Sequence, residues 1–148
     1  MIKAVIDTNV LVSGLWTHDQ NAPTKRILDA LLVGDFVCLL SDEILTEYID
    51  VLNRDKFNFN KEDVSRLIEH IERFGKKITP ERSGDSFPDP DDRIFYEVTL
   101  SVPDARLVTG NQKHFPISPI VVTPAQFCEM IGIPHISPSH TLSPSRHS

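Results

Sequence analysis

The sequence has 148 residues, a length typical of one domain, and 40 % of them are hydrophobic, which excludes an intrinsically disordered chain. Its formal net charge of −6 argues against a protein that binds nucleic acid passively through the phosphates, because such proteins are usually basic. The acidic balance remains compatible with an enzyme that holds phosphate through bound metal ions.

The first third of the chain predicts strands alternating with helices. An apolar, β-branched run over 3–6 predicts a strand, and the polar residues 7–9 predict a loop after it. A helix is expected over 23–34, because a proline begins it and a glycine ends it. A second strand over 36–40 leads into a helix over 41–52 that starts with a serine N-cap.

The alternation continues through the rest of the chain. Asn60 is the expected N-cap of a helix whose apolar residues, including Phe74, recur at 3.6-residue spacing. This helix is expected over 60–75. After it we expect a strand over 77–79, a loop over 83–91, a helix over 93–102, strands over 106–109 and 120–122, and a helix from Pro124.

This order predicts an α/β fold with a central, mainly parallel sheet and helices on both faces. Ligands bind such sheets at the carboxyl ends of the strands. Residues 134–148 are rich in proline, serine and histidine and have almost nothing apolar, so we expect a loose tail after a domain of residues 1–133.

Polar residues that could form a site occur at four places, three of which are strand ends or helix starts. Asp7 directly follows the first strand, and Glu47 borders the apolar stripe of its helix. Asp92 belongs to a group of three acids at the start of a helix, and Asn111 closes a turn after another strand. Each also has an ordinary structural explanation. Asp7 could be a turn residue and Glu47 a partner in a salt bridge, the acids around Asp92 could cap their helix, and Asn111 could belong to an ordinary turn.

Taken together, these residues predict a metal site. Crowded carboxylates repel one another unless a cation neutralises them, and oxygen-rich clusters suit Mg²⁺ or Mn²⁺. A divalent ion held in this way can activate water and stabilise the leaving oxygen of a phosphodiester. Zinc is not expected, because the sequence has neither Cys-x-x-Cys nor His-Glu-x-x-His spacing.

The sequence also bears on location. It has no apolar run near the ~18 residues of a membrane span and no secretory signal at its start, so we expect a cytoplasmic protein without a membrane partner. Cys38 and Cys128 lie in apolar segments, and we expect them to be reduced core residues.

Four blocks in the chain resemble the PIN-domain family, in particular the VapC-like toxins of prokaryotic toxin–antitoxin pairs. The similarity extends from about Ile2 to Ile133. The blocks are Val5–Val12 (VIDTNVLV), Ser41–Tyr48 (SDEILTEY), Asp89–Phe95 (DPDDRIF) and Leu107–Asn111 (LVTGN), in this order.

The resemblance implies a three-layer α/β/α fold, Mg²⁺ or Mn²⁺, and endonucleolytic cleavage of RNA. Its acids map onto Asp7, Glu47 and Asp92 as catalytic and metal-binding residues. A fourth acid is often present where this chain has Asn111, which can offer a carbonyl oxygen to a metal but no charge. The resemblance also implies a cognate antitoxin protein as partner, and it leaves a homodimer open.

Two alternatives to the nuclease remain. A haloacid-dehalogenase-like phosphatase would use Asp7 as nucleophile, but Asn9 stands where its second acid is expected. A catalytically inactive PIN fold that serves as a binding module is supported by Asn111 and opposed by the three retained acids.

Overall fold

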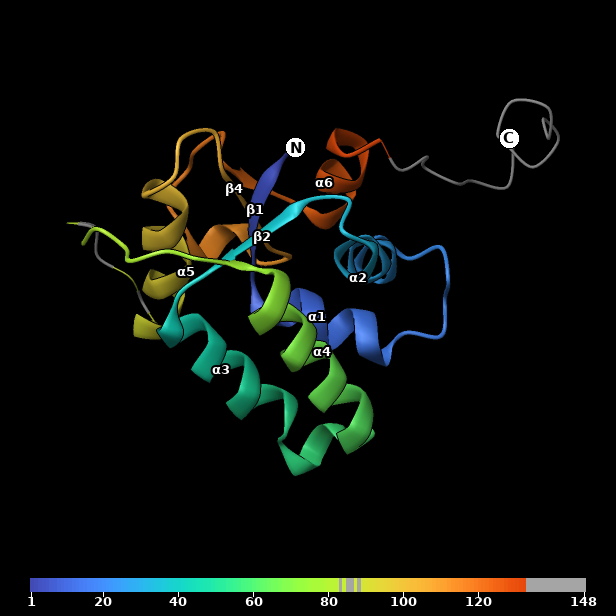
Figure 1. Ribbon diagram of the computed structural model, residues 1–148. Helices are drawn as coiled ribbons and strands as arrows, with labels where there is room; N and C mark the ends of the chain where they lie inside the picture. Colours follow the sequence, from blue (N-terminus) through green and yellow to red (C-terminus); the bar gives the residue numbers. More distant parts are fainter. Residues whose placement is uncertain (83, 85–86, 88, 133–148) are drawn as a thin grey trace, which may run out of the picture.

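The computed structural model describes residues 1–82, 84, 87 and 89–132, which form five strands and six α-helices (Figure 1). The strands are all parallel and lie in the order β3-β2-β1-β4-β5, which confirms the predicted parallel sheet. Their bounds are Lys3–Ile6 for β1, Val37–Leu40 for β2, Lys76–Lys77 for β3, Arg106–Val108 for β4 and Val121–Val122 for β5.

The helices cover both faces of this sheet. Figure 1 shows the sheet between α5 on one side and α2 with α6 on the other, while α3 and α4 form a hairpin below it. This is the predicted three-layer α/β/α architecture. The helices are α1 (Thr8–Trp16), α2 (Pro23–Val33), α3 (Asp42–Leu52), α4 (Lys61–Phe74), α5 (Pro90–Leu100) and α6 (Pro124–Met130).

The register of the central strands decides which residues meet at the C-terminal edge of the sheet. Ile6 pairs with Val108 across β1 and β4, so the residues that follow the two strands come out side by side. The backbone N–H of Asp7 continues the ladder by donating to the carbonyl of Val108 at 3.0 Å. The first predicted site residue and the Thr-Gly-Asn turn are therefore neighbours.

The predicted helix ends are confirmed where local chemistry determines them. The Ser41 hydroxyl accepts the N–H of Ile44 at 3.2 Å and so caps α3. The Asn60 side chain accepts two backbone N–H groups at the start of α4. Gly34 ends α2 with φ of 81°, a left-handed conformation that glycine adopts without strain.

The loop predicted after the first strand is wrong, because α1 begins directly at Thr8 with Asp7 as its N-cap. Val10 and Leu11 are buried, so packing against the core stabilises a helix that the local sequence does not announce. Gly14 permits this packing. A Cβ at this position would lie 2.9 Å from the carbonyl oxygen of Thr24 in α2.

Two further elements differ from the prediction in extent. Helix α5 starts at Pro90 rather than near residue 93, and the third strand is Lys76–Lys77 rather than 77–79. Phe74 continues the apolar spacing of α4 but is 66 % exposed. Its ring contacts the ring of His70, which is itself partly buried, at 4.7 Å between centroids.

Three other expectations concern the cysteines, the membrane and the tail. Cys38 and Cys128 are free and buried, as predicted. None of the helices in the described part of the chain is long and apolar enough to cross a membrane. The loop predicted over 83–91 lies partly, and the tail predicted over 134–148 entirely, outside the described residues.

Candidate active site

Asp7 lies at the centre of the site, between the end of β1 and the start of α1. Its side chain is only 5 % exposed. Burial raises the pKa of this carboxyl above its ordinary value, and hydrogen bonds from Thr109 and from the backbone N–H groups of Asn9 and Thr8 at the start of α1 oppose that rise. Asp7 is therefore a buried carboxylate whose charge depends on specific partners.

Thr109 is the partner that orients Asp7. It is completely buried and donates its hydroxyl proton to Oδ2 of Asp7 at 2.7 Å. The same hydroxyl oxygen accepts the backbone N–H of Asn111 at 2.9 Å. Thr109 thus links two predicted site residues and acts as a positioning residue, a role that the sequence analysis missed although the motif contains it.

The start of α5 brings a second carboxylate to Asp7. Asp89 caps the helix by accepting the N–H of Asp91 at 2.9 Å, which confirms that one of the three acids is a cap. Asp92 is left for another role. Burial, then the negative charges of Asp7 and Asp89, raise its pKa to about 6. Asp7 and Asp92 therefore stand close enough to repel each other.

Glu47 reaches the same edge of the sheet from α3, beside the start of α5. Burial raises its pKa, and the charge of Asp91 adds to the rise, while the Arg54 guanidinium lowers it. The neighbouring Tyr48 is fully buried and donates its hydroxyl proton to the carbonyl of Ile6 at the end of β1. This bond fixes α3 against β1 and so sets the position of Glu47.

His114 is a member of the cluster that the sequence analysis missed. It ends the 3₁₀ helix η2 (Gln112–His114), and its Nδ1 lies 3.6 Å from Oδ2 of Asp92. When protonated, it lowers the pKa of both Asp92 and Asp7. Only its proximity to Asn111 in the sequence could have indicated this position.

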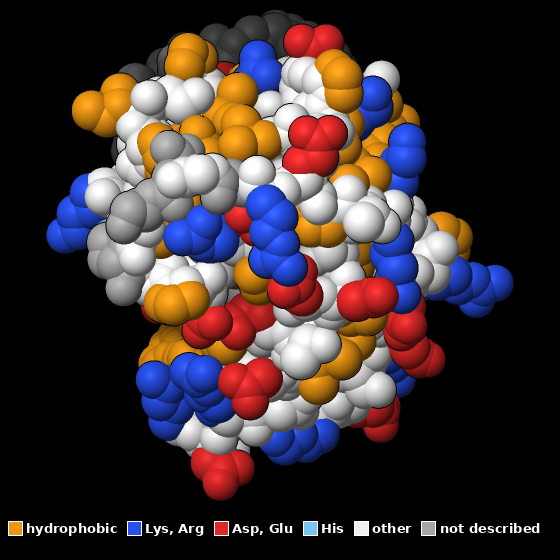
Figure 2. Space-filling model, turned by 90° about the vertical axis from the view of Figure 1, so that its left-hand side faces the viewer, with side chains coloured by type: hydrophobic (Ala, Val, Ile, Leu, Met, Phe, Trp, Pro, Cys, Tyr) orange, Lys and Arg blue, Asp and Glu red, His pale blue; other side chains and the backbone are white. Residues whose placement is uncertain are grey.

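The structure thus brings Asp7 and Asp92 together, while Glu47 lies near Asp91 and Asp89 at the start of α5, and the three acids do not form a tight ligand set. Within residues 1–82, 84, 87 and 89–132, no three His, Cys, Asp or Glu side chains are grouped closely enough to hold a metal ion. Figure 2 shows acidic side chains interspersed with Lys and Arg side chains in the lower half of the face that carries α5 and the start of α3. Hard carboxylate oxygens that repel one another fit Mg²⁺ or Mn²⁺ by their chemistry.

The fold is a three-layer α/β/α fold with a parallel sheet, and ligands bind such sheets at the carboxyl ends of the strands. Acidic side chains lie at this edge, so the protein is of a class with an acidic active site. The chain belongs to the PIN domain family, because the model of that family matches residues 3–113. The matched region contains all four predicted site residues. PIN domains are generally nucleases, so the match favours a nuclease over the phosphatase alternative. Searches of curated proteins and of solved structures found no match.

Proposed function

We propose that this protein is a cytoplasmic endoribonuclease that uses Mg²⁺ or Mn²⁺ held by Asp7, Glu47 and Asp92. The observation that carries the proposal is the match of the PIN domain model to residues 3–113, which include these three acids. The electrostatics agree with it, because burial, and then the charge of Asp7, raise the pKa of Asp92 to about 6. Carboxylates that repel each other in a partly buried place gain stability from a divalent cation between them. Asn111 would add a neutral amide oxygen.

When bound, a divalent ion lowers the pKa of its water and stabilises the charge that develops on a phosphodiester. The protein's own residues prepare the place. Thr109 holds one oxygen of Asp7 in a fixed direction through a bond of 2.7 Å. Tyr48 anchors α3 to β1 and thereby keeps Glu47 at the same edge. His114 lies within 3.6 Å of Asp92 and balances its charge when protonated.

The test is cleavage of single-stranded RNA with Mg²⁺ or Mn²⁺ and with chelator, in the natural protein and in charge-neutral variants. Glu47→Gln should lose activity and keep its fold, and so should Asp7→Asn. Glu43→Gln is a matched control, because Glu43 lies one turn earlier on α3 with its side chain in solvent. Undiminished cleavage in chelator would contradict the metal mechanism, and equal losses in the Glu47 and Glu43 variants would contradict the site.

We further propose that the nuclease is the toxin of a toxin–antitoxin pair, with RNA as substrate and an antitoxin as inhibitor. The order of the four sequence blocks supports this role. Expression of the natural protein should then arrest growth, and Asp7→Asn should not. Co-expression of the product of the neighbouring gene should relieve the arrest, and arrest that persists would remove the antitoxin from the proposal.

Asn111 favours a second candidate, an inactive PIN fold that binds RNA without cutting it. Its amide cannot replace the charge of a carboxylate. The backbone N–H of Asn111 nevertheless donates to Thr109, so the turn itself is intact. RNA binding that needs no divalent ion and leads to no cleavage would favour this candidate.

A further inference from the structure

Three aromatic side chains form a cluster at the end of α1. The ring of Trp16 meets Phe57 and Phe59 at centroid distances of 5.6 and 6.2 Å, almost perpendicular to both. Phe57 and Phe59 stack on each other at 5.4 Å with an interplanar angle of 11°. We call these three residues the aromatic cluster.

Trp16 remains open in this arrangement. The two phenyl rings form one stack, so their perpendicular contact covers at most one face of the indole. Its side chain is accordingly 56 % exposed. Burial of an aromatic ring is strongly favourable, and a large ring left open on a rigid support is suited to stack on a ligand.

The aromatic cluster is connected to the candidate active site through two helices. Asp7 caps α1 and Trp16 ends it, and nine helical residues span about 13 Å. Glu47 lies on α3, and Phe57 ends the short 3₁₀ helix η1 (Asp55–Phe57) that follows α3. The helices next to two of the three site carboxylates, Asp7 and Glu47, therefore lead to the same cluster.

A cation lies directly over the aromatic rings. Residues 54–61 carry Arg54, Lys56 and Lys61 beside the acid Asp55. Arg54 pairs with Asp50 at 3.0 Å and Lys61 donates to the carbonyl of Asn53 at 3.0 Å, so the cation at the rings is Lys56. The Lys56 ammonium lies 5.1 Å from the centroid of the Phe57 ring. The Arg54 charge also reaches the site, because it lowers the pKa of Glu47.

We propose that the aromatic cluster is the platform on which a base of the single-stranded RNA substrate stacks, a few nucleotides from the scissile bond. The base would lie on the open face of Trp16, and Lys56 would contact a neighbouring phosphate. Stacking on an aromatic ring suits single strands, because their bases are free and every base has a π-face. This assignment rests on the proposed function, since it deepens the substrate class of the same enzyme.

Intrinsic fluorescence tests the contact directly, because Trp16 is the only tryptophan of the chain. The full-length Asp92→Asn variant, which should not cut RNA, is titrated with an unstructured oligoribonucleotide. Binding is followed in parallel by the anisotropy of a label on the RNA. We expect the tryptophan emission to be quenched along the binding curve. Saturated binding with unchanged emission would overturn the proposal.

Kinetics of variants provide the second test. Trp16→Ala should raise KM for single-stranded RNA about tenfold, the effect of losing one base–aromatic stack, with kcat unchanged. Trp16→Phe keeps a ring and should recover most of the loss, which separates stacking from a folding defect. An RNA with an abasic site at the stacked position should show the same loss in the natural protein and no further loss with Trp16→Ala.

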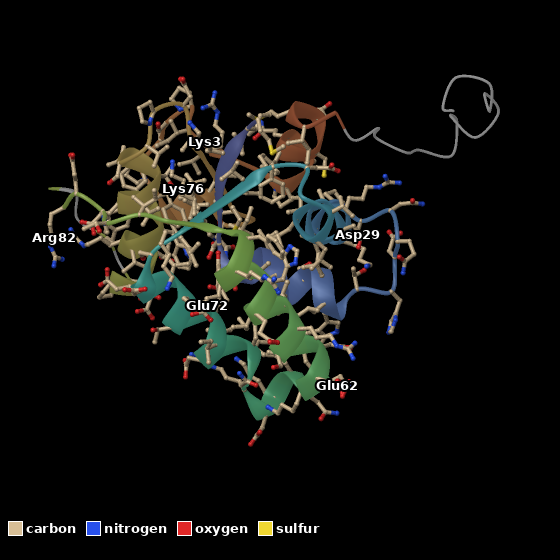
Figure 3. The ribbon with its side chains drawn as sticks, in the orientation of Figure 1. Lys3, Asp29, Glu62, Glu72, Lys76 and Arg82 are labelled. Carbon is tan, nitrogen blue, oxygen red and sulfur yellow. The ribbon has the colours of Figure 1, made fainter. Side chains whose placement is uncertain are left out.

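Phe74→Ala is the matched control. Phe74 is also an exposed ring with a cation over it, the Arg73 guanidinium at 5.5 Å from its centroid. It lies at the opposite end of α4 from Phe59, and Figure 3 shows Glu62 and Glu72 marking the two ends. Phe74→Ala should leave KM unchanged, and an increase equal to that of Trp16→Ala would overturn the platform.

The outcomes separate this proposal from the proposed function. If the natural protein does not cut RNA, the nuclease fails, while the fluorescence titration still reports stacking. If it cuts RNA and Trp16→Ala has the natural KM, only the platform fails. Trp16→Ala could also cut RNA with the natural KM but fail to bind the product of the neighbouring gene. In that case this surface would be a protein contact, and the RNA assignment would be overturned.

Discussion

Replacement of Thr109 by valine tests how the protein holds its central carboxylate. Valine keeps the approximate shape and removes the hydroxyl that donates to Asp7 at 2.7 Å and accepts from Asn111 at 2.9 Å. Both polar groups then lose a partner in a place where Thr109 itself is completely buried. An unsatisfied buried group that carries charge costs about 2 kcal/mol, so Tm should fall by roughly 6 °C for a domain of this size.

The loss should depend on pH. The hydrogen bond from Thr109 lowers the pKa of Asp7 against the rise caused by burial, so it stabilises the charged form. Without the hydroxyl the pKa rises further. The penalty of Thr109→Val is therefore fully present above the pKa of Asp7 and shrinks as acid protonates the carboxyl. Cleavage should also fall steeply, because Asp7 is no longer held in one direction.

Thr99→Val provides the control for this experiment. Thr99 is buried as well, but its hydroxyl donates at 2.8 Å to the carbonyl of Phe95 within α5, where no carboxylate is involved. Its loss should be smaller, independent of pH and without effect on activity. Thermal melts of both variants in chelator, at neutral and acid pH, make the comparison. Equal Tm losses at both pH values and full activity of Thr109→Val would refute the positioning role.

Three further predictions concern charge and packing. Without metal, Tm of the natural protein should fall as pH rises from about 4 to about 6, because the pKa of Asp92 in the folded protein is about 6 against an ordinary 3.8. In a series of thermal melts over this pH range, Asp92→Asn should show a smaller fall. Asn111→Asp adds repulsion between carboxylates, so the variant should have a lower Tm in chelator and a larger rise in Tm on addition of Mn²⁺ than the natural chain. Equal rises in Tm would place Asn111 away from the metal. Gly14→Ala should cost about 1–3 kcal/mol by denaturant unfolding, since its Cβ would meet Thr24, whereas Gly110→Ala has open space and should cost less.

Local chemistry in the sequence determines much of this fold. Ser41 and Asn60 begin helices because their side chains accept backbone N–H groups a few residues ahead, an interaction that needs no distant partner. The short apolar runs predicted buried strands, and their alternation with helices predicted a parallel sheet. Asp7 could be placed at the ligand edge for the same reason, because it directly follows such a strand.

Tertiary structure alone decided the contacts between distant segments. Helix α1 forms because the core buries Val10 and Leu11, and its sequence carries no strong helix signal of its own. The bond from Thr109 to Asp7 joins residues 102 positions apart, and it exists because β1 and β4 are neighbours in register. Strand order depends on the burial of the whole sheet, which no local pattern records.

The division is the same at the site. The sequence indicated Asp92 as one acid among three. Only the folded chain separates the capping Asp89 from Asp92, whose pKa burial and the charge of Asp7 raise. Folding also brings Nδ1 of His114 to 3.6 Å from Oδ2 of Asp92. The sequence determines the type of each side chain. The electrostatic interaction between two side chains depends on their distance and burial, and here the packing of α5 and β4 against β1 sets both.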